Sequence, residues 1–581
     1  MCGIAGSTDL STNPDIERRV RAVTESLRHR GPDNIGVVAF DGGALGMARL
    51  RICSRPDEPV PFRTKYGIAA YNGEVYGQVD RDLRLRDAPE GGPGEVEMLL
   101  AHSDQVLPDG MYALALAEQK RGITLKRDVF GIKPLHLLAH SGGYAFASEL
   151  LPLAQEFGSA RVNRQAAAEY LLFGRPVGNA TYAGGIQKLP PGATAYLSGN
   201  EVRIEHAPMA ALWRRRATDT APPDVGDLVA SLESSVAACL NAQRQVGLAL
   251  SGGVDSTLIA AIAARLGAQS LTTVSVMVAG STDGLRDLMQ LGLPGNAWRS
   301  WRHHVTAVGP DDFPELLSRS VGASGAPTRM TSLPLYLALA QTAAEGGTVV
   351  LVTGEGADEL FLGYRRYPAL LDQLETSSDR LGLLMDGLTG GPTMRHWAVR
   401  LLGSRRVADC EARFRSHHAD IADMTPLDAL RNLELKYSLE PLLARTDIAL
   451  MAESIEGRTP FLHGAMPGLA AAAGPDQLIL GRQGKRLIYE AALKVLGPKA
   501  KLREKRRFRA PVPAWINGPL SEWAASRMTA NVQLLEAAGF EADGVLSLAH
   551  RTAARDTTTP SLAYAVLTHI EAAAQLLGQP A

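Results

Sequence analysis

The most informative stretch of this chain is Val246-Gly247-Leu248-Ala249-Leu250-Ser251-Gly252-Gly253-Val254-Asp255-Ser256. Its apolar beginning predicts a strand buried on both faces, and the apolar pattern over residues 257–266 predicts a helix after the turn. The two adjacent glycines allow a sharp turn and a close ligand, while the serine hydroxyls and the N–H groups at the helix start can donate to phosphate oxygens. The stretch therefore predicts an anion site, although a glycine-rich turn that binds nothing is the alternative. It is not a Walker A loop, because the Gly-Lys-Ser/Thr ending is missing.

Strands and helices alternate from residue 225 onward. We expect helices over about 225–242, over about 257–266 after the turn, and over about 334–345. We expect one strand that ends at 250 and two more near 271–278 and 348–353. This succession predicts an open parallel α/β sheet, in which ligands bind at the carboxyl ends of the strands. The anion site lies at such an end.

Length and composition exclude several classes of protein. With 581 residues the chain is too long for one ordinary core, so we expect two or three domains. A formal net charge of -1 gives no overall attraction to nucleic acid or acidic membranes. No apolar stretch is long enough to span a bilayer and no signal peptide is evident, so we expect a cytoplasmic protein. The 4 cysteines are too scattered for a disulfide framework or a zinc site.

Cys2 differs from the other cysteines because it follows the initiator methionine. Removal of Met1 would leave a thiol and an α-amino group on one residue, and the usual amino pKa of about 7.7–8.0 suits a general base. Nucleophile and base would then be delivered together. The alternative is a terminal cysteine with no role.

Five motifs give Cys2 a context. They are Met1-Cys2-Gly3-Ile4, Arg28-His29-Arg30-Gly31-Pro32-Asp33, Ala48-Arg49-Leu50, Tyr71-Asn72-Gly73-Glu74-Val75-Tyr76 and Arg127-Asp128-Val129-Phe130-Gly131-Ile132-Lys133-Pro134-Leu135. In content and order this set resembles the class II glutamine amidotransferases. The resemblance implies an α+β N-terminal-nucleophile (Ntn) hydrolase sandwich, with two antiparallel sheets between helices (αββα). Alternating and apolar runs near 36–40, 67–71, 112–117, 122–126 and 144–147 fit a β-rich domain.

The resemblance also implies roles for individual residues. Cys2 would attack the side-chain amide of glutamine, and Asn72 with the Gly73 N–H would form the oxyanion hole. Arg49 would pair with the glutamine α-carboxylate. Glu74 and Glu95 would bind the substrate, Glu95 standing where the family has an aspartate for the α-amino group. The alternatives are a surface ion pair for the arginine and an ordinary hairpin turn for Asn-Gly.

The second half carries another resemblance. Ser-Gly-Gly-Val-Asp-Ser at 251–256 resembles the pyrophosphate loop of ATP pyrophosphatases, and Thr-Gly-Glu-Gly-Ala-Asp-Glu at 353–359 resembles an element of asparagine synthetases. The resemblance implies ATP, cleaved between its α and β phosphates, and Mg²⁺ held by Asp255 and Asp358. Glu355 would steer or deprotonate incoming ammonia, and Lys485 would neutralise charge at the phosphates. The ATP-binding residues would be Leu250, Ser251, Gly252, Gly253, Asp255, Ser256, Val276 and Gly354.

Three segments depart from the asparagine synthetase pattern. Residues 279–302 lack the Asp-Glu pair that is usual in the family, and only the His303-His304 pair that follows them is recognisable. Further along, His463 stands where the family has an aspartate. The acceptor region 325–334 matches only loosely. The basic run 501–511 resembles a segment near the phosphates more than a nucleic-acid patch.

These observations predict a glutaminase domain over 1–205, a linker over 206–226 and an asparagine-synthetase-like ATP-pyrophosphatase domain over 227–581. We expect a glutamine-dependent amidotransferase that adenylates a carboxylate, passes ammonia between two sites along an internal route, and releases an amide, AMP and pyrophosphate. The acceptor is aspartate in one hypothesis and another carboxylic acid of specialised metabolism in a second. A non-catalytic nucleotide-binding regulator is the third. We expect no nucleic acid or membrane partner, and a homodimer is possible.

Overall fold

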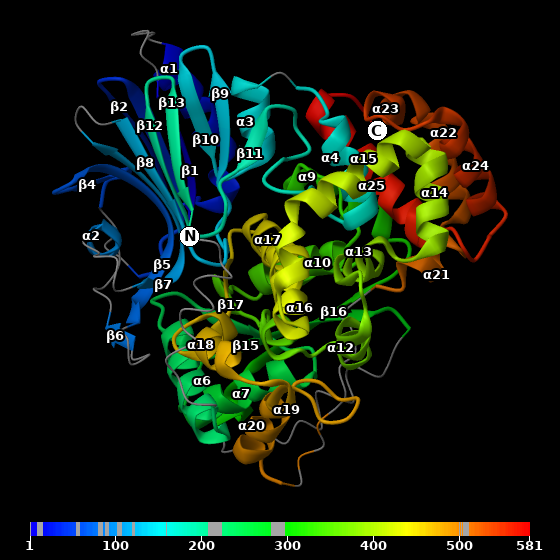
Figure 1. Ribbon diagram of the computed structural model, residues 1–581. Helices are drawn as coiled ribbons and strands as arrows, with labels where there is room; N and C mark the ends of the chain where they lie inside the picture. The colour runs from blue at the N-terminus through cyan, green and yellow to red at the C-terminus, as the bar shows by residue number, and fades with distance from the viewer. Residues whose placement is uncertain are drawn as a thin grey trace.

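The computed structural model describes residues 2–8, 15–53, 58–79, 85–87, 92–100, 107–118, 122–158, 160–206, 223–280, 297–498, 500, 502 and 510–580. In the first part of the chain two antiparallel sheets are stacked face to face (Figure 1). The first has the order β11 (Ile186–Lys188), β9 (His136–His140), β10 (Gly143–Ala147), β1 (Cys2–Thr8), β3 (Gly43–Arg49), β2 (Asn34–Phe40). The second has the order β13 (Glu201–His206), β12 (Ala193–Ser198), β8 (Gly122–Arg127), β7 (Leu107–Glu118), β5 (Gly67–Val79), β4 (Phe62–Thr64), and β6 (Leu85–Asp87) pairs with β5.

Helices cover the outer faces of both sheets. α1 (Asp15–Ser26) and α3 (Leu150–Phe157) pack on the first sheet, and α2 (Pro93–Leu100) packs on the second. α4 (Arg164–Phe173) follows, capped by Asn163 at its start. The apolar residues between the sheets include Ile4, Met47 and Leu114. The predicted αββα sandwich is confirmed, because strands of both sheets, among them β1, β3, β5, β7 and β8, present apolar side chains to the space between the sheets.

The second part of the chain is built on a five-stranded parallel sheet. Its order is β16 (Arg302–Val308), β15 (Thr272–Val278), β14 (Val246–Ala249), β17 (Val350–Val352), β18 (Glu456–Arg458). Helix α6 (Val225–Leu240) precedes the first of these strands in the sequence, α7 (Val254–Arg265) follows β14, and α9 (Phe313–Ser324) and α10 (Leu333–Glu345) lie between β16 and β17. The predicted parallel α/β sheet is therefore confirmed, with the anion loop directly after its central strand.

Helices make up the remainder. They are α11 (Ala357–Phe361), α12 (Tyr367–Thr376), α13 (Arg380–Thr389), α14 (Pro392–Leu402), α15 (Ser404–His417), α16 (Pro426–Glu434), α17 (Glu440–Met451), α18 (Met466–Ala472), α19 (Pro475–Leu478), α20 (Arg486–Leu496), α21 (Val512–Ile516), α22 (Ser521–Ala530), α23 (Val532–Ala537), α24 (Ala542–Ala553) and α25 (Pro560–Leu577). Short 3₁₀ turns are η1 (Arg28–Arg30), η2 (Ala297–Ser300), η3 (Ala419–Asp423) and η5 (Pro460–Leu462), and η4 (Leu435–Leu439) is a π-helical turn.

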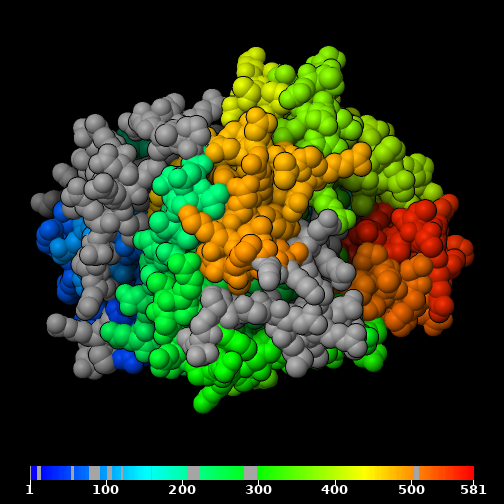
Figure 2. Space-filling view, turned by 90° about the horizontal axis from the view of Figure 1, so that it is seen from below, coloured from blue at the N-terminus to red at the C-terminus, as the bar shows by residue number. Residues whose placement is uncertain are grey.

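Segments distant in sequence meet around the sheet. α20 packs against α6 and α7, and Figure 2 shows this late segment (orange) beside the early green one on a single face. α25 returns to contact α3 and α4 of the sandwich. Within the described residues, no helix combines the length and apolar character that crossing a membrane requires. Of the predicted linker, residues 207–222 lie outside the described residues, and α6 begins at Val225 with an Asp224 cap.

Candidate active sites

Cys2 is the first residue of β1 and lies at the edge of a small cavity of about 40 Å³. Its backbone nitrogen donates to Asn72 Oδ1 at 3.0 Å, and the register of β1 with β3 places it opposite Arg49. That nitrogen would become the α-amino group if Met1 were removed. Burial raises the pKa of the Cys2 thiol, so a thiolate at this position would need a nearby base to form.

Asn72 and Gly73 lie beside the thiol on β5. The Asn72 side-chain nitrogen is buried and has no hydrogen-bond acceptor among the described residues. Gly73 has φ 147°, and a Cβ on it would lie 2.0 Å from Met111 O, so only glycine fits. Two donors held next to a thiol can stabilise an oxyanion.

The predicted glutamine-binding side chains surround the same cavity. Arg49 donates to the Glu58 backbone oxygen at 3.0 Å and to Glu58 Oε2 at 3.1 Å. A glutamine α-carboxylate would have to replace the Glu58 carboxylate in this pairing. Burial raises the pKa of Glu95 to about 8, against the opposing effect of the Tyr71 hydroxyl.

The cavity also receives a carboxylate from the other part of the chain, which we did not predict. Glu456 of β18 lines it, and Arg458 Nε donates to Glu456 Oε1 at 2.6 Å. Arg458 also forms an ion pair with Glu74. Burial raises the pKa of Glu74, although Arg458 opposes the change. The sequence contains the Glu-Gly-Arg run at 456–458, but no local pattern indicates that it faces Cys2.

The anion loop joins β14 to α7. Ser251 N donates to Ser256 Oγ at 3.2 Å, and the two hydroxyl oxygens lie 3.1 Å apart. Gly252 and Gly253 form the turn itself and do not line the pocket described below. The loop thus orients two hydroxyls at the start of a helix, as an anion site requires.

Lys485 is the centre of a buried charge cluster. Its Nζ lies 2.7 Å from both carboxylate oxygens of Asp255 and 2.7 Å from Asp358 Oδ1. Lys485 has φ 58° in the left-handed region, which is uncommon for a residue with a side chain and frequent at functional sites.

The two aspartates fit a magnesium ion. Mg²⁺ is usually bound by one or two carboxylates, with water and substrate phosphates completing the shell. Asp255 and Asp358 converge on a single cationic group from two different helices. Across the part of the chain that the structure describes, no cluster of three or more His, Cys, Asp or Glu residues suits a metal. Any magnesium at this pair would therefore complete its shell with phosphate or water oxygens.

Glu355 lies in the turn after β17. It accepts hydrogen bonds from the Tyr336 hydroxyl and from Arg445 Nη2, the latter at 2.5 Å. The guanidinium of Arg445 also stacks over the Tyr336 ring, 3.8 Å from its centroid. The carboxylate is thus fixed toward a pocket of about 630 Å³. The predicted residues that line this pocket are Leu250, Ser251, Asp255, Ser256, Val276, Gly354, Glu355 and Asp358.

Polar and apolar side chains both line the rest of this pocket. The apolar ones include Phe173, Met330, Leu388, Met394, Leu442 and Tyr564. Arg329 lies among them and donates to the backbone oxygens of Leu172 at 2.6 Å and Leu388 at 3.0 Å. Burial lowers the pKa of Arg329 to about 10. The sandwich domain contributes Phe173 to the lining, so the pocket is formed by both parts of the chain.

The segments that depart from the family pattern are only partly placed. Residues 281–296, 501 and 503–509 lie outside the described residues. His303 and His304 are on β16, the edge strand of the parallel sheet. His463 is buried at the junction of the two domains, with its ring 4.4 Å from that of Tyr76. None of these histidines lies in the pocket lining.

Comparison with known proteins agrees with this two-part description. The family model described as asparagine synthase matches residues 227–575, and one described as a glutamine amidotransferase domain matches residues 1–207. A putative glutamine-hydrolysing asparagine synthetase of Mycobacterium bovis is 28% identical over 574 residues, covering 88% of this chain and 87% of the relative. Asparagine synthetase B of Escherichia coli is 24% identical, covering 93% of this chain and 87% of the relative. Glutamine-hydrolysing asparagine synthetase 1 of Bacillus subtilis is 23% identical, covering 90% of this chain and 89% of the relative.

Proposed function

Because this chain belongs to the asparagine synthase family, we propose that it moves ammonia from glutamine to a carboxylic acid that ATP has activated as an acyl-adenylate. It is a glutamine-hydrolysing, ATP-dependent ligase with an Ntn-type glutaminase domain. The observation that carries the proposal is that one chain holds both the Cys2–Asn72 pair and the Asp255–Lys485–Asp358 cluster.

In the first half-reaction the Cys2 sulfur attacks the glutamine side-chain carbonyl carbon. Asn72 and the Gly73 N–H stabilise the oxyanion, and its collapse expels ammonia and leaves a thioester. Water then hydrolyses the thioester, which gives glutamate and restores the thiol. The carboxylates around the cavity supply the counter-charge that the substrate α-ammonium group needs.

In the second half-reaction a carboxylate oxygen of the acceptor attacks the α-phosphorus of ATP, and pyrophosphate leaves. Lys485 and the Ser251–Ser256 loop neutralise the negative charge that develops there. Mg²⁺, held by Asp255 and Asp358, would supply further counter-charge to the phosphates. Ammonia then attacks the acyl-adenylate with Glu355 as the candidate proton acceptor, and an amide and AMP are released. Ammonia would pass between the sites along the domain interface.

The acceptor decides between two candidate functions. The names of the bacterial relatives give asparagine as the product, and aspartate is the acceptor that would yield it. The apolar side chains of Phe173, Leu388 and Met394 in the pocket lining support an acid with a larger apolar body as the second candidate. A non-catalytic nucleotide-binding regulator is the remaining alternative, and the buried catalytic-type cluster at Lys485 argues against it.

A product assay by mass spectrometry tests the proposal. The full chain is incubated with ATP, Mg²⁺, glutamine and aspartate. Asparagine with an equal amount of AMP would establish aspartate as the acceptor. Glutamate without aspartate-dependent AMP would direct the search to other carboxylic acids, and absence of pyrophosphate release across a panel of acids would refute the ligase assignment. Sedimentation of the same preparation tests whether the chain forms a homodimer.

A further inference from the structure

Helix α17 of the second domain carries two side chains that reach the two different sites. Arg445 donates to Glu355 in the synthetase pocket, and Asp447 accepts from Arg30 in the glutaminase domain at 2.7 Å. Residues two apart on an α-helix are rotated by about 200°. The two side chains therefore leave the helix in nearly opposite directions, and a rigid shift of α17 would move both.

Asp447 is the meeting point of two buried cations. Its Oδ2 pairs with Arg30 Nη2 and its Oδ1 lies 3.6 Å from Lys133 Nζ. All three side chains are at most 2% exposed. Arg30 has a second partner, Glu149 at 3.0 Å, from its own domain. Because buried charges require partners, this carboxylate fixes where both cations lie.

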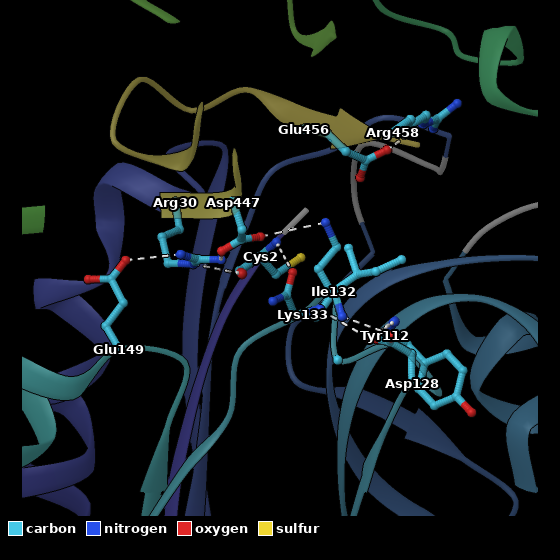
Figure 3. A network of polar contacts seen from close by, with 12 residues as sticks. Cys2, Arg30, Tyr112, Asp128, Ile132, Lys133, Glu149, Asp447, Glu456 and Arg458 are labelled. Atoms are coloured by element: carbon cyan, nitrogen blue, oxygen red, sulfur yellow. Dashed lines mark hydrogen bonds and ion pairs between the residues drawn. The ribbon is translucent and has the colours of Figure 1, made fainter. Parts of the chain in front are cut away.

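Arg30 and Lys133 are each connected by hydrogen bonds to a different strand of the glutaminase site (Figure 3). Arg30 Nε donates to the Cys2 backbone oxygen at 3.4 Å. The Lys133 backbone N–H donates to Asp128 Oδ2 at 3.0 Å, and the same oxygen accepts from Tyr112 N at 3.3 Å. Tyr112 of β7 stands opposite Gly73 of β5. The nucleophile strand and the oxyanion strand are thus both attached to one carboxylate of the other domain.

The opposite end of this connection lies at the ATP site. Arg445 donates to Ser332 Oγ at 2.7 Å as well as to Glu355. Glu355 belongs to the turn between β17 and α11, and α11 carries Asp358. A ligand that displaces the turn carrying Glu355 would therefore also displace Arg445.

We propose that Asp447 is a positioning residue that couples the two sites through α17. Nucleotide in the synthetase pocket shifts α17 and, through Asp447, adjusts Cys2 and Gly73 for glutamine hydrolysis. By thermodynamic linkage, occupancy at Cys2 changes the affinity for nucleotide by the same factor. This inference rests on the proposed function, since it takes glutamine and ATP as the two ligands.

Binding measurements on the full chain test the coupling. The affinity for α,β-methylene ATP with Mg²⁺ is measured by calorimetry before and after Cys2 is alkylated with a diazoketone analogue of glutamine. In the wild type the Kd should change by about fivefold or more, as in typical coupled sites. In Asp447→Asn, which keeps the shape of the side chain and removes its charge, the change should fall below about twofold.

Glu440→Gln is the matched control. Glu440 lies on the same helix and forms a buried ion pair with Arg175 of the glutaminase domain, but it lines neither cavity. The control should keep the wild-type change in Kd. Loss of the change in both variants would mean that any weakened interface uncouples the sites, and that result would overturn the role of Asp447.

Other outcomes separate this inference from the proposed function. Binding of both ligands to the wild type with no change in Kd overturns the coupling alone. Failure of the wild type to bind nucleotide or to react with the analogue overturns the proposed function and the coupling with it. If Asp447→Asn does not fold, the double variant Arg30→Gln, Asp447→Asn, which removes a cation together with the carboxylate, is measured instead. A wild-type change in that protein would overturn the inference.

Discussion

Replacement of Gly73 by alanine gives a sharp test of the oxyanion site. The added Cβ would lie 2.0 Å from Met111 O and 2.6 Å from Tyr112 Cα, both in backbone of the neighbouring strand β7. Ordinary Cβ contacts are not shorter than 3.0 Å, so β5 must move away from β7 by about 1 Å. A displacement of this size at a catalytic group costs about 10²-fold, and complete loss of one oxyanion donor costs about 10²–10³-fold.

We therefore expect Gly73→Ala to lower the kcat for glutamate release by about 100-fold to 1000-fold. Amide formation from ammonium chloride should stay within about twofold of the wild type, because the synthetase site is not touched. Gly42→Ala is the matched control, since Gly42 also has positive φ, 92°, but a Cβ on it meets no described atom within 4 Å. The Gly42→Ala variant has the same kind of backbone strain, about 1–3 kcal/mol, but its added Cβ does not collide with a neighbouring strand. Glutamate release by Gly73→Ala within about threefold of the wild type would refute the placement of the oxyanion hole.

Four further changes test the other assignments. Cys2→Ala should abolish glutamine use and leave amide formation from ammonium in the product assay, and persistent glutamate release would exclude the thiol as nucleophile. Asp255→Ala should stop pyrophosphate release while glutamine hydrolysis continues, and continued adenylation would contradict the metal site. Lys485→Met should lower the free energy of unfolding by about 3 kcal/mol, because two buried carboxylates lose their shared cation. Mg²⁺ should raise the melting temperature of this variant more than that of the wild type. An equal rise in melting temperature in both proteins would contradict Asp255 and Asp358 as Mg²⁺ ligands. Burial raises the pKa of Glu95 to about 8, so its carboxylate forms as the pH rises. Calorimetry on the Cys2→Ala protein should therefore show glutamine binding that tightens about tenfold between about pH 6.5 and about pH 8. The double variant Cys2→Ala, Glu95→Gln should show no such pH dependence.

Local sequence patterns determined most of the architecture of this protein. The apolar run before Ser251 became β14, and the predicted helices near 225–242 and 334–345 became α6 and α10. The alternating runs of the first 205 residues became strands of two antiparallel sheets. Periodicity is a short-range property of the chain, so it can be read without knowing what each element packs against. The candidate residues Cys2, Asn72 and Lys485 came from the resemblance of short contiguous motifs to known families, which also requires no knowledge of the packing.

The packing of the two domains brings together charges that are far apart in the sequence. Lys485 is 230 residues from Asp255 in sequence, and Arg458 is 384 residues from Glu74. The sequence contains no sign that Glu456 lines the glutaminase cavity or that Asp447 holds Arg30. Such pairs form when two domains bury polar groups against each other, and each group then takes whatever partner the packing brings within reach. Sequence patterns therefore predicted two domains and their candidate reactive groups, whereas the packing of β18 and α17 against the sandwich brings Glu456 and Asp447 to the first domain.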